Sequence, residues 1–295
     1  MSTLTYRAAS VVSFAGLLSL ALVSSSIRAE DKPAAEQEFI ALLQSDAPAK
    51  HKAIACKKLA VVGTEAAVPE LAKLLSDEHL ASWARIALEA IPGAASDAAL
   101  RTAAGSVDGN LLIGVVNSIG VRRDAGAVEL LTSLMKNSNP TVASSASVAL
   151  GRIGNETTTK TLRDALASAP DNVRSAVAEG CILCAERALA DGQTAEAIAI
   201  YDQVRTAKVP QQRIVEATRG AILARGDEGI PLLVENLRSG EKKLFEIALI
   251  TAREIPGNKI DAALAAQRLA LPLREVLHRA EHAAATLPIE QDGHP

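Results

Sequence analysis

The chain has 295 residues, of which 48% are hydrophobic and only 2% aromatic. Such a core of small aliphatic side chains suits closely packed helices and argues against β-sandwiches and barrels, whose strands are rich in β-branched and aromatic residues. The formal net charge of −3 gives no overall attraction for nucleic acid or anionic lipid, and the scarcity of aromatic rings argues against base-stacking and carbohydrate-binding clefts.

Residues 1–29 have the n-, h- and c-region order of a secretory signal peptide. Arg7 supplies the positive charge, an apolar stretch covers 11–23, and Ile27-Arg28-Ala29 offers a cleavage site. The apolar stretch is too short to span a bilayer as a mature helix. An uncleaved N-terminal anchor is the alternative. We expect cleavage after Ala29, a periplasmic or secreted protein, and no membrane insertion after cleavage.

Residues 30–47 are expected to hold a polar linker over 30–35 and a lead-in helix over 36–46. Phe39, Leu42 and Leu43 would form the apolar side of that helix.

A repeated turn organises residues 48–270. Glycines recur about every 32 residues, a spacing typical of solenoids, at Gly63, Gly93, Gly120, Gly154, Gly192, Gly226 and Gly257. An apolar helix precedes each glycine and another follows it, and the glycine suits a left-handed position at the end of a helix. The segment therefore predicts an all-α, right-handed α-solenoid of about seven helical pairs.

The second helix of each pair is expected to line the concave face of the solenoid. These helices are expected over 66–76, 95–104, 125–136, 157–168, 194–206, 229–238 and 260–269.

Two segments resemble HEAT-like repeats: residues 150–155 with Leu162 and Leu166, and residues 65–71. The fifth unit, over 185–201, resembles a tetratricopeptide repeat. Residues 80–93 and 116–124 resemble secreted HEAT-repeat proteins of planctomycete-type bacteria. There the array often precedes a c-type cytochrome or sugar-hydrolase-like domain; this chain contains neither sequence up to Pro295, so the resemblance implies no activity housed in those domains.

A charged cluster, Arg122, Arg123 and Asp124, stands in one turn where other units have one or two polar residues. It forms either an arginine–aspartate ladder between stacked turns or a contact patch for an acidic partner. We take these three as the candidate partner-contact residues.

Cys181-x-x-Cys184 has the spacing of a redox pair or half of a metal site, but Ala185 excludes haem attachment and no second pair completes a zinc site. A strained disulfide is an alternative in an oxidising compartment. The favoured interpretation is that both are small core residues. Cys56 is expected to be a buried thiol.

Two further motifs are better explained by their place in the fold than by metal binding or adhesion. His278 and His282 share a helix face and could hold a metal, but a solvated face of the terminal helix is favoured. Arg225-Gly226-Asp227 spells an adhesion tripeptide and also falls where every unit has its turn. With no nucleophile elbow and no glycine-rich phosphate loop, we predict no catalytic, cofactor-binding or metal residues.

Residues 271–295 are expected to form a terminal helix, from Leu273 to Thr286, and a polar tail. Leu273, Val276 and Leu277 would leave its apolar stripe uncovered, so self-association through this helix is expected.

Together the sequence predicts a non-catalytic, exported protein–protein interaction scaffold that binds another exported protein or peptide. One alternative is an accessory or truncated module of a larger secreted redox or carbohydrate-active protein. A weaker one is a lyase, because some HEAT-like proteins resemble phycobilisome lyases.

Overall fold

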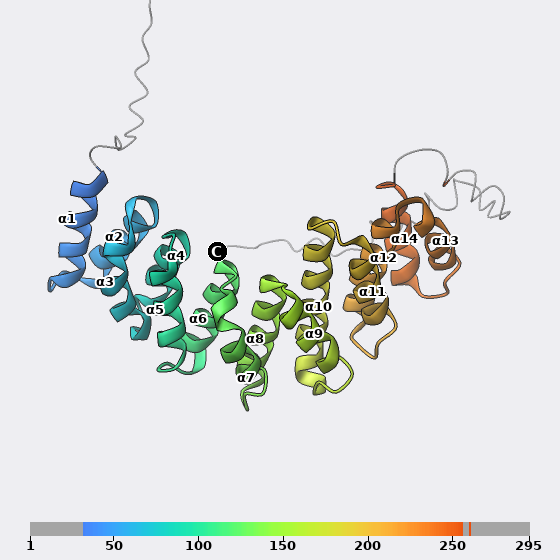
Figure 1. Ribbon diagram of the computed structural model, residues 1–295, viewed down its shortest axis with the longest axis horizontal. Coiled ribbons are helices and arrows are strands. Elements are labelled where there is room, and N and C mark those ends of the chain that lie inside the picture. Colours follow the sequence, from blue (N-terminus) through green and yellow to red (C-terminus); the bar gives the residue numbers. More distant parts are fainter. Residues whose placement is uncertain (1–31, 256–259, 261–295) are drawn as a thin grey trace, which may run out of the picture.

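The computed structural model describes residues 32–255 and 260, and this part of the chain contains helices and turns but no β-strand. The helices form a crescent of two layers (Figure 1). They are α1 (Lys32–Gln44), α2 (Ala49–Val62), α3 (Val68–Lys73), α4 (Ala81–Ala90), α5 (Ala94–Ala104), α6 (Gly109–Arg122), α7 (Val128–Leu134), α8 (Pro140–Ile153), α9 (Glu156–Ala165), α10 (Asp171–Ala190), α11 (Thr194–Arg205), α12 (Gln211–Arg225), α13 (Ile230–Leu237) and α14 (Lys242–Ala252). Short 3-10 helices are η1 (Glu65–Ala67), η2 (Leu74–Ser76), η3 (Ala125–Ala127) and η4 (Gly226–Gly229).

The predicted α-solenoid of helical pairs is confirmed. Within the described residues, α2–α3 to α12–α13 form complete pairs, and α14 is the first helix of the next pair. The helix expected over 66–76 is built from η1, α3 and η2. The signal peptide, the last second helix beyond Ile260 and the terminal helix from Leu273 to Thr286 lie outside the described residues.

The prediction that second helices line the concave face is wrong. Figure 1 shows the even-numbered helices α2 to α14 on the concave side of the crescent and the odd-numbered helices α3 to α13 on the convex side. We call these the inner and outer layers, and we count α1 with the outer layer.

Small residues between inner helices explain this curvature. α8 packs directly against α6 on one side and α10 on the other. A Cβ on Gly151 of α8 would lie 2.5 Å from the Cα of Gly180 on α10, and one on Gly120 of α6 would lie 2.9 Å from the Cα of Ala149 on α8. The outer helices α9 and α11 instead leave a groove of about 1090 Å³ between them. Because inner helices approach more closely than outer ones, the stack bends toward the inner layer.

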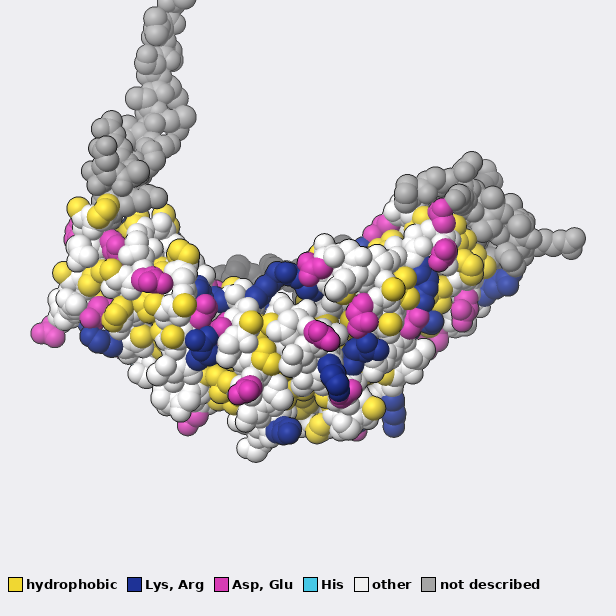
Figure 2. All heavy atoms as spheres, viewed as in Figure 1, with side chains coloured by type: hydrophobic (Ala, Val, Ile, Leu, Met, Phe, Trp, Pro, Cys, Tyr) yellow, Lys and Arg dark blue, Asp and Glu magenta, His cyan; other side chains and the backbone are white. Residues whose placement is uncertain are grey.

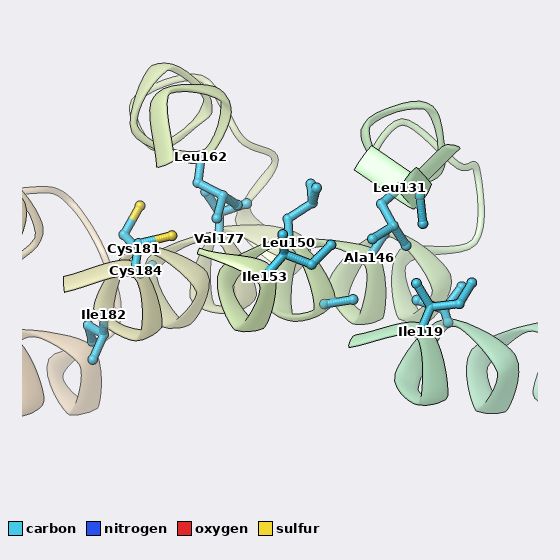
Figure 3. Close-up of a cluster of buried hydrophobic side chains, with 14 of the residues drawn as sticks. Ile119, Leu131, Ala146, Leu150, Ile153, Leu162, Val177, Cys181, Ile182 and Cys184 are labelled. Atoms are coloured by element: carbon cyan, nitrogen blue, oxygen red, sulfur yellow. The ribbon is translucent and has the colours of Figure 1, made fainter. Parts of the chain in front are cut away.

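The core lies between the two layers and runs along the whole stack. Figure 3 shows Leu131 of α7 and Leu162 of α9 pointing toward Ala146 and Leu150 of α8 and Val177 of α10. All five are at most 1% exposed. Truncating one such leucine to alanine costs about 2–5 kcal/mol, so this continuous seam of contacts holds neighbouring units together.

The left-handed position expected of the turn glycines occurs in some turns only, since Gly63 at the end of α2 has φ −67°. At the end of α8, Gly154 has φ 62°, and the side chain of Asn155 caps α9 by accepting from the amide of Thr158 at 2.9 Å. At the end of α6 the same left-handed position is held by Arg123, with φ 53°. Gly120, predicted as the turn glycine, instead lies inside α6, where its lack of a side chain permits the close approach of α8.

The lead-in helix begins earlier than expected. α1 starts at Lys32, so residues 32–35 are helical rather than linker; Pro33 fits there because proline is tolerated in a first helical turn. Glu36, 5% exposed, accepts hydrogen bonds from the Thr64 amide at 2.6 Å and from its hydroxyl at 2.9 Å. This carboxylate thus fixes α1 to the turn after α2.

Candidate interaction surface

Arg122, at the end of α6, is used inside the solenoid. Its side chain is 9% exposed and forms an ion pair with Asp97 of α5. Nη1 donates to the carbonyl oxygens of Leu88 and Ile91, both at 2.7 Å, and Nη2 donates to that of Gly93 at 2.9 Å. The last carbonyls of a helix have no partner within it. Arg122 therefore closes the end of α4 and joins it to the next unit.

The other two predicted contact residues divide between interior and surface. Asp124 is 8% exposed, accepts from the amide of Gly126 at 2.9 Å, and is ion-paired with Arg101 of α5. Arg123 is exposed. The structure thus shows an arginine–aspartate network between neighbouring units, and only Arg123 of the three faces solvent.

The cysteines lie in the core as free thiols. Figure 3 shows Cys181 and Cys184 on α10, close to the core leucines. Burial raises the pKa of Cys181 to about 12 and also raises that of Cys184, whose Sγ lies 3.9 Å from the carbonyl oxygen of Gly151. Burial likewise raises the pKa of Cys56 to about 11. Since the thiolate is the nucleophile and metal ligand, these sites disfavour both chemistries at neutral pH.

The adhesion-like tripeptide is part of the packing between α11 and α12. Arg225 forms an ion pair with Asp202 of α11 and donates to the carbonyl oxygen of Ala221 at 2.9 Å. The guanidinium is therefore held within the unit. The pair His278 and His282 lies outside the described residues.

One surface was missed by sequence reasoning, because only the layering reveals it. Seven large hydrophobic side chains are exposed in the described part of the chain, and all seven belong to the inner layer. They are Ile54 and Val61 on α2, Trp83 and Ile86 on α4, Val121 on α6, Leu189 on α10 and Ile250 on α14. We call the first five, on three consecutive inner helices, the apolar ridge.

The sequence did contain a weak signal for this ridge. On α4, Ala84, Ala87 and Leu88 form the buried stripe, whereas Trp83 and Ile86 fall beside it and are 39% and 48% exposed. A helix with apolar residues on more than one face has more apolar surface than its own core contacts need. Without the neighbouring helices, however, a second apolar face cannot be told from a wider core contact.

The one arginine of α4 does not cover the ridge. Arg85 is half-buried, and its Nη1 donates to the carbonyl oxygen of Gly114 at 3.1 Å and to the hydroxyl of Ser118 at 3.3 Å, both on α6. The guanidinium is thereby committed to the contact between α4 and α6. Trp83 and Ile86 are left as the large side chains that α4 presents to solvent.

The groove between α9 and α11 is a second concave feature, on the outer side. Its lining includes Lys160 and Asp164, which pair at 2.6 Å, and Arg163 and Glu196, which pair at 2.8 Å. These charges are matched within the groove. Its polar lining differs from that of a typical small-molecule site, which is mostly apolar.

Two other kinds of site are absent from residues 32–255 and 260. No group of three or more His, Cys, Asp or Glu side chains is placed to hold a metal ion. None of the helices there combines the length and hydropathy that crossing a bilayer requires.

Comparison with known proteins finds a family match over part of the chain. Residues 98–181 match HEAT repeats, whereas no curated protein matches the chain. Similar solved structures include an engineered protein (21% identity, 79% of this chain and 72% of that chain, TM-score 0.40) and human deoxyhypusine hydroxylase in complex with glycerol (15%, 78% and 98%, TM-score 0.39). A designed armadillo repeat protein is also similar (17%, 74% and 99%, TM-score 0.32). These identities and TM-scores are too low to transfer an activity or a partner. The chain is a helical-repeat protein whose residues 98–181 match HEAT repeats.

Proposed function

We propose that this protein is a non-catalytic, exported interaction scaffold that binds another exported protein through the apolar ridge. One observation carries the proposal: every exposed large hydrophobic side chain of the described helices lies on the inner layer. Single exposed apolar side chains are ordinary on a protein surface. Their confinement to one face, across three successive helices, is typical of a binding surface.

Trp83 is the residue best suited to anchor a partner. Tryptophan is enriched among the residues whose truncation weakens protein–protein binding most. Trp83 is the only tryptophan in the chain and is 39% exposed. Ile86 lies three residues further along α4, so the two side chains are neighbours on one helix.

Export is part of the proposal, and its support is the signal-peptide order of residues 1–29. Mass spectrometry of the protein purified from its own cell should find a mature N-terminus at Glu30. A cytosolic chain that still begins near Met1 would overturn export while leaving the ridge proposal open to its own test.

A matched pair of double variants tests the ridge. Ile86→Arg with Val121→Arg puts two charges on the ridge, whereas Ala98→Arg with Ala199→Arg puts the same charges at exposed positions of the outer layer. Each tagged chain is used as bait in the periplasm or culture medium, and captured proteins are identified by mass spectrometry. A specific partner should be retained by wild type and the outer-layer variant and lost from the ridge variant. Equal retention by both variants would contradict the proposal.

A further inference from the structure

The two layers carry opposite net charges, which the chain's total of −3 conceals. The inner helices α2 to α14 contain fourteen Lys and Arg and six Asp and Glu, a net charge of +8. The outer helices, counted with α1 and the 3-10 helices, contain six and thirteen, a net charge of −7. Figure 2 shows Lys and Arg side chains over the middle of the concave edge. A neutral-to-acidic chain thus has a basic inner face.

Most acidic side chains of the inner layer are already occupied. Arg213 of α12 pairs with Glu179 of α10 and, at 2.7 Å, with Glu216 of its own helix. Glu89 of α4 accepts from the hydroxyl of Ser118 at 2.6 Å. These contacts consume carboxylates within the fold, so they offer little negative charge to a partner.

The unmatched positive charge is concentrated on α2. This helix contains four lysines and no acidic residue. They make no hydrogen bond or ion pair with any described residue, and three of them are exposed: Lys50, Lys57 and Lys58. A cluster of unpaired cations on one helix attracts a negatively charged partner within a Debye length of about 8 Å at physiological salt.

These lysines flank the apolar ridge on the same helix face. Ile54 stands four residues after Lys50 and four before Lys58, and Val61 stands four residues after Lys57. Residues three or four apart are neighbours on a helix surface. The ridge therefore has a basic border at α2, which is the arrangement that complements an apolar stripe bordered by carboxylates.

We propose that the inner face of α2, α4 and α6 binds an acidic amphipathic helix of a partner protein. The inference rests on the proposed scaffold function and adds the chemical class of the partner. Packed helices lie about 8–10 Å apart, and apolar residues seven apart on a bound helix are spaced by about 10 Å. One apolar residue of the bound helix therefore falls on each ridge helix, while its carboxylates meet the lysines of α2.

Two other anionic partners fit the surface less well. A flat anionic bilayer that rests on the ends of the crescent meets α2 but does not reach α6, which lies deeper on the concave side (Figure 1). Single-stranded nucleic acid binds through successive aromatic side chains, and Trp83 is the one exposed aromatic side chain on the ridge.

Fluorescence anisotropy with three synthetic peptides tests the assignment on the mature chain. Each fluorescein-labelled peptide has about 20 residues, a length of roughly 30 Å when helical. The first has leucines along one stripe and glutamates elsewhere; the second has lysines in place of the glutamates; the third has serines in place of the leucines. We expect the acidic leucine peptide to bind at least about ten-fold more tightly than either control, a difference that shrinks in high salt.

Two charge-reversal variants locate the binding. The triple variant Lys50→Glu, Lys57→Glu and Lys58→Glu should weaken binding of the acidic peptide at least about ten-fold, because three exposed ion pairs are lost and three repulsions are gained. Lys73→Glu with Lys136→Glu and Lys160→Glu changes the net charge equally on exposed side chains outside the inner layer and should leave binding within about two-fold. Circular dichroism checks that both variants keep the helical fold.

The outcomes separate the two proposals. If Ile86→Arg with Val121→Arg abolishes peptide binding but the α2 reversal does not, the ridge proposal stands and the acidic-partner inference fails. If neither change affects binding, or no peptide binds, the acidic-partner inference fails, and the capture experiment alone decides the ridge proposal. Tighter binding of vesicles of phosphatidylglycerol or of an unstructured DNA oligonucleotide than of the acidic peptide would overturn the assignment to a protein partner.

Discussion

Two arginines from each half of the inner layer differ in their main partners. In the N-terminal half, Arg85 and Arg122 donate to backbone carbonyls of neighbouring helices and are drawn into the interior. In the C-terminal half, Arg213 and Arg219 of α12 pair with Glu179 of α10 and with Glu254, in the turn after α14. Both schemes join adjacent repeats, but they leave different surfaces behind.

The comparison relates the packing of a helix to what its exposed face can do. An arginine buried against carbonyls removes charge from the surface, and the apolar side chains beside it stay accessible, as at Trp83 and Ile86. An arginine in a surface pair keeps its helix face polar and matched, as with Arg219 and Glu254, which are 43% and 35% exposed. Binding capacity is therefore expected in the N-terminal half and salt-dependent cross-linking in the C-terminal half.

The largest expected effect contrasts one arginine from each half. Arg122→Ala should lower the free energy of unfolding by about 3 kcal/mol, because it leaves buried carbonyls and Asp97 without their partner. Arg219→Ala should cost less than about 1 kcal/mol, since its pair is exposed. Urea unfolding followed by circular dichroism measures both. Equal costs for the two variants would break the comparison between halves.

The contact between α8 and α10 joins the two halves and has almost no free space. Gly151→Ala should destabilise the protein by about 2 kcal/mol, because the added Cβ overpacks the contact with the backbone of Gly180. Gly105→Ala is the matched control: its Cβ would meet only the carbonyl oxygen of Thr102 at 3.5 Å. Thermal unfolding compares the two, and a Gly151→Ala protein as stable as the control would show that the halves are free to move apart.

Asp202 should make the C-terminal half sensitive to acid. Burial raises the pKa of Asp202, but hydrogen bonds from Arg205 and Arg225 outweigh it and hold the pKa below 3.8, its ordinary value. The Asp202 carboxylate therefore binds a proton more readily in the unfolded chain than in the folded protein. The stability that ionised Asp202 contributes is complete above pH 3.8 and is lost as the pH falls through its folded-state pKa.

Asp202→Asn should therefore cost about 1 kcal/mol at neutral pH, given its partial exposure, and should flatten the fall in stability below pH 3.8. Asp164→Asn removes the exposed pair with Lys160 and serves as control. Urea midpoints across this range provide the measurement. If the Asp202→Asn protein lost stability in acid as steeply as wild type, groups other than Asp202 would be responsible for that loss.

The smallest effect concerns the left-handed turn at the edge of the ridge. Arg123→Gly should raise the free energy of unfolding by about 0.5 kcal/mol, since glycine adopts φ 53° without the penalty of a side chain. Arg123→Ala keeps the strained backbone and should show no gain. A stabilised Arg123→Gly protein that binds the acidic peptide less tightly would sharpen the comparison, because charge would then be kept there at the expense of stability.

The repeat architecture could be predicted because each turn depends on local chemistry. Gly154, Gly192 and Gly226 have φ between 56° and 78°, which other residues adopt only at a cost, so glycine spacing marked the turns. Gly120 shows the limit of this rule. It also follows an apolar run, but it serves a contact with α8, and sequence alone does not distinguish a turn glycine from a contact glycine.

The candidate surface could be predicted less well, because it depends on contacts between helices distant in sequence. The curvature follows from how closely Gly151 approaches Gly180. This contact cannot be inferred from either residue's place in the sequence. Likewise, the sequence shows a charged cluster at Arg122 and Asp124, but it does not show that the guanidinium of Arg122 faces inward. The basic inner face was hidden because the acidic outer layer cancels it in the total.

Opposite charges on two helical layers give the molecule a permanent dipole. With layers about 10 Å apart, charges of this size correspond to a moment on the order of a few hundred debye. Its axis runs across the crescent, from the convex to the concave side (Figure 1). An approaching negative partner experiences a torque that turns the open side of the crescent toward it before contact. Association should therefore be faster than random collision allows and should slow as ionic strength rises, whereas dissociation, governed by the apolar contacts, should change little.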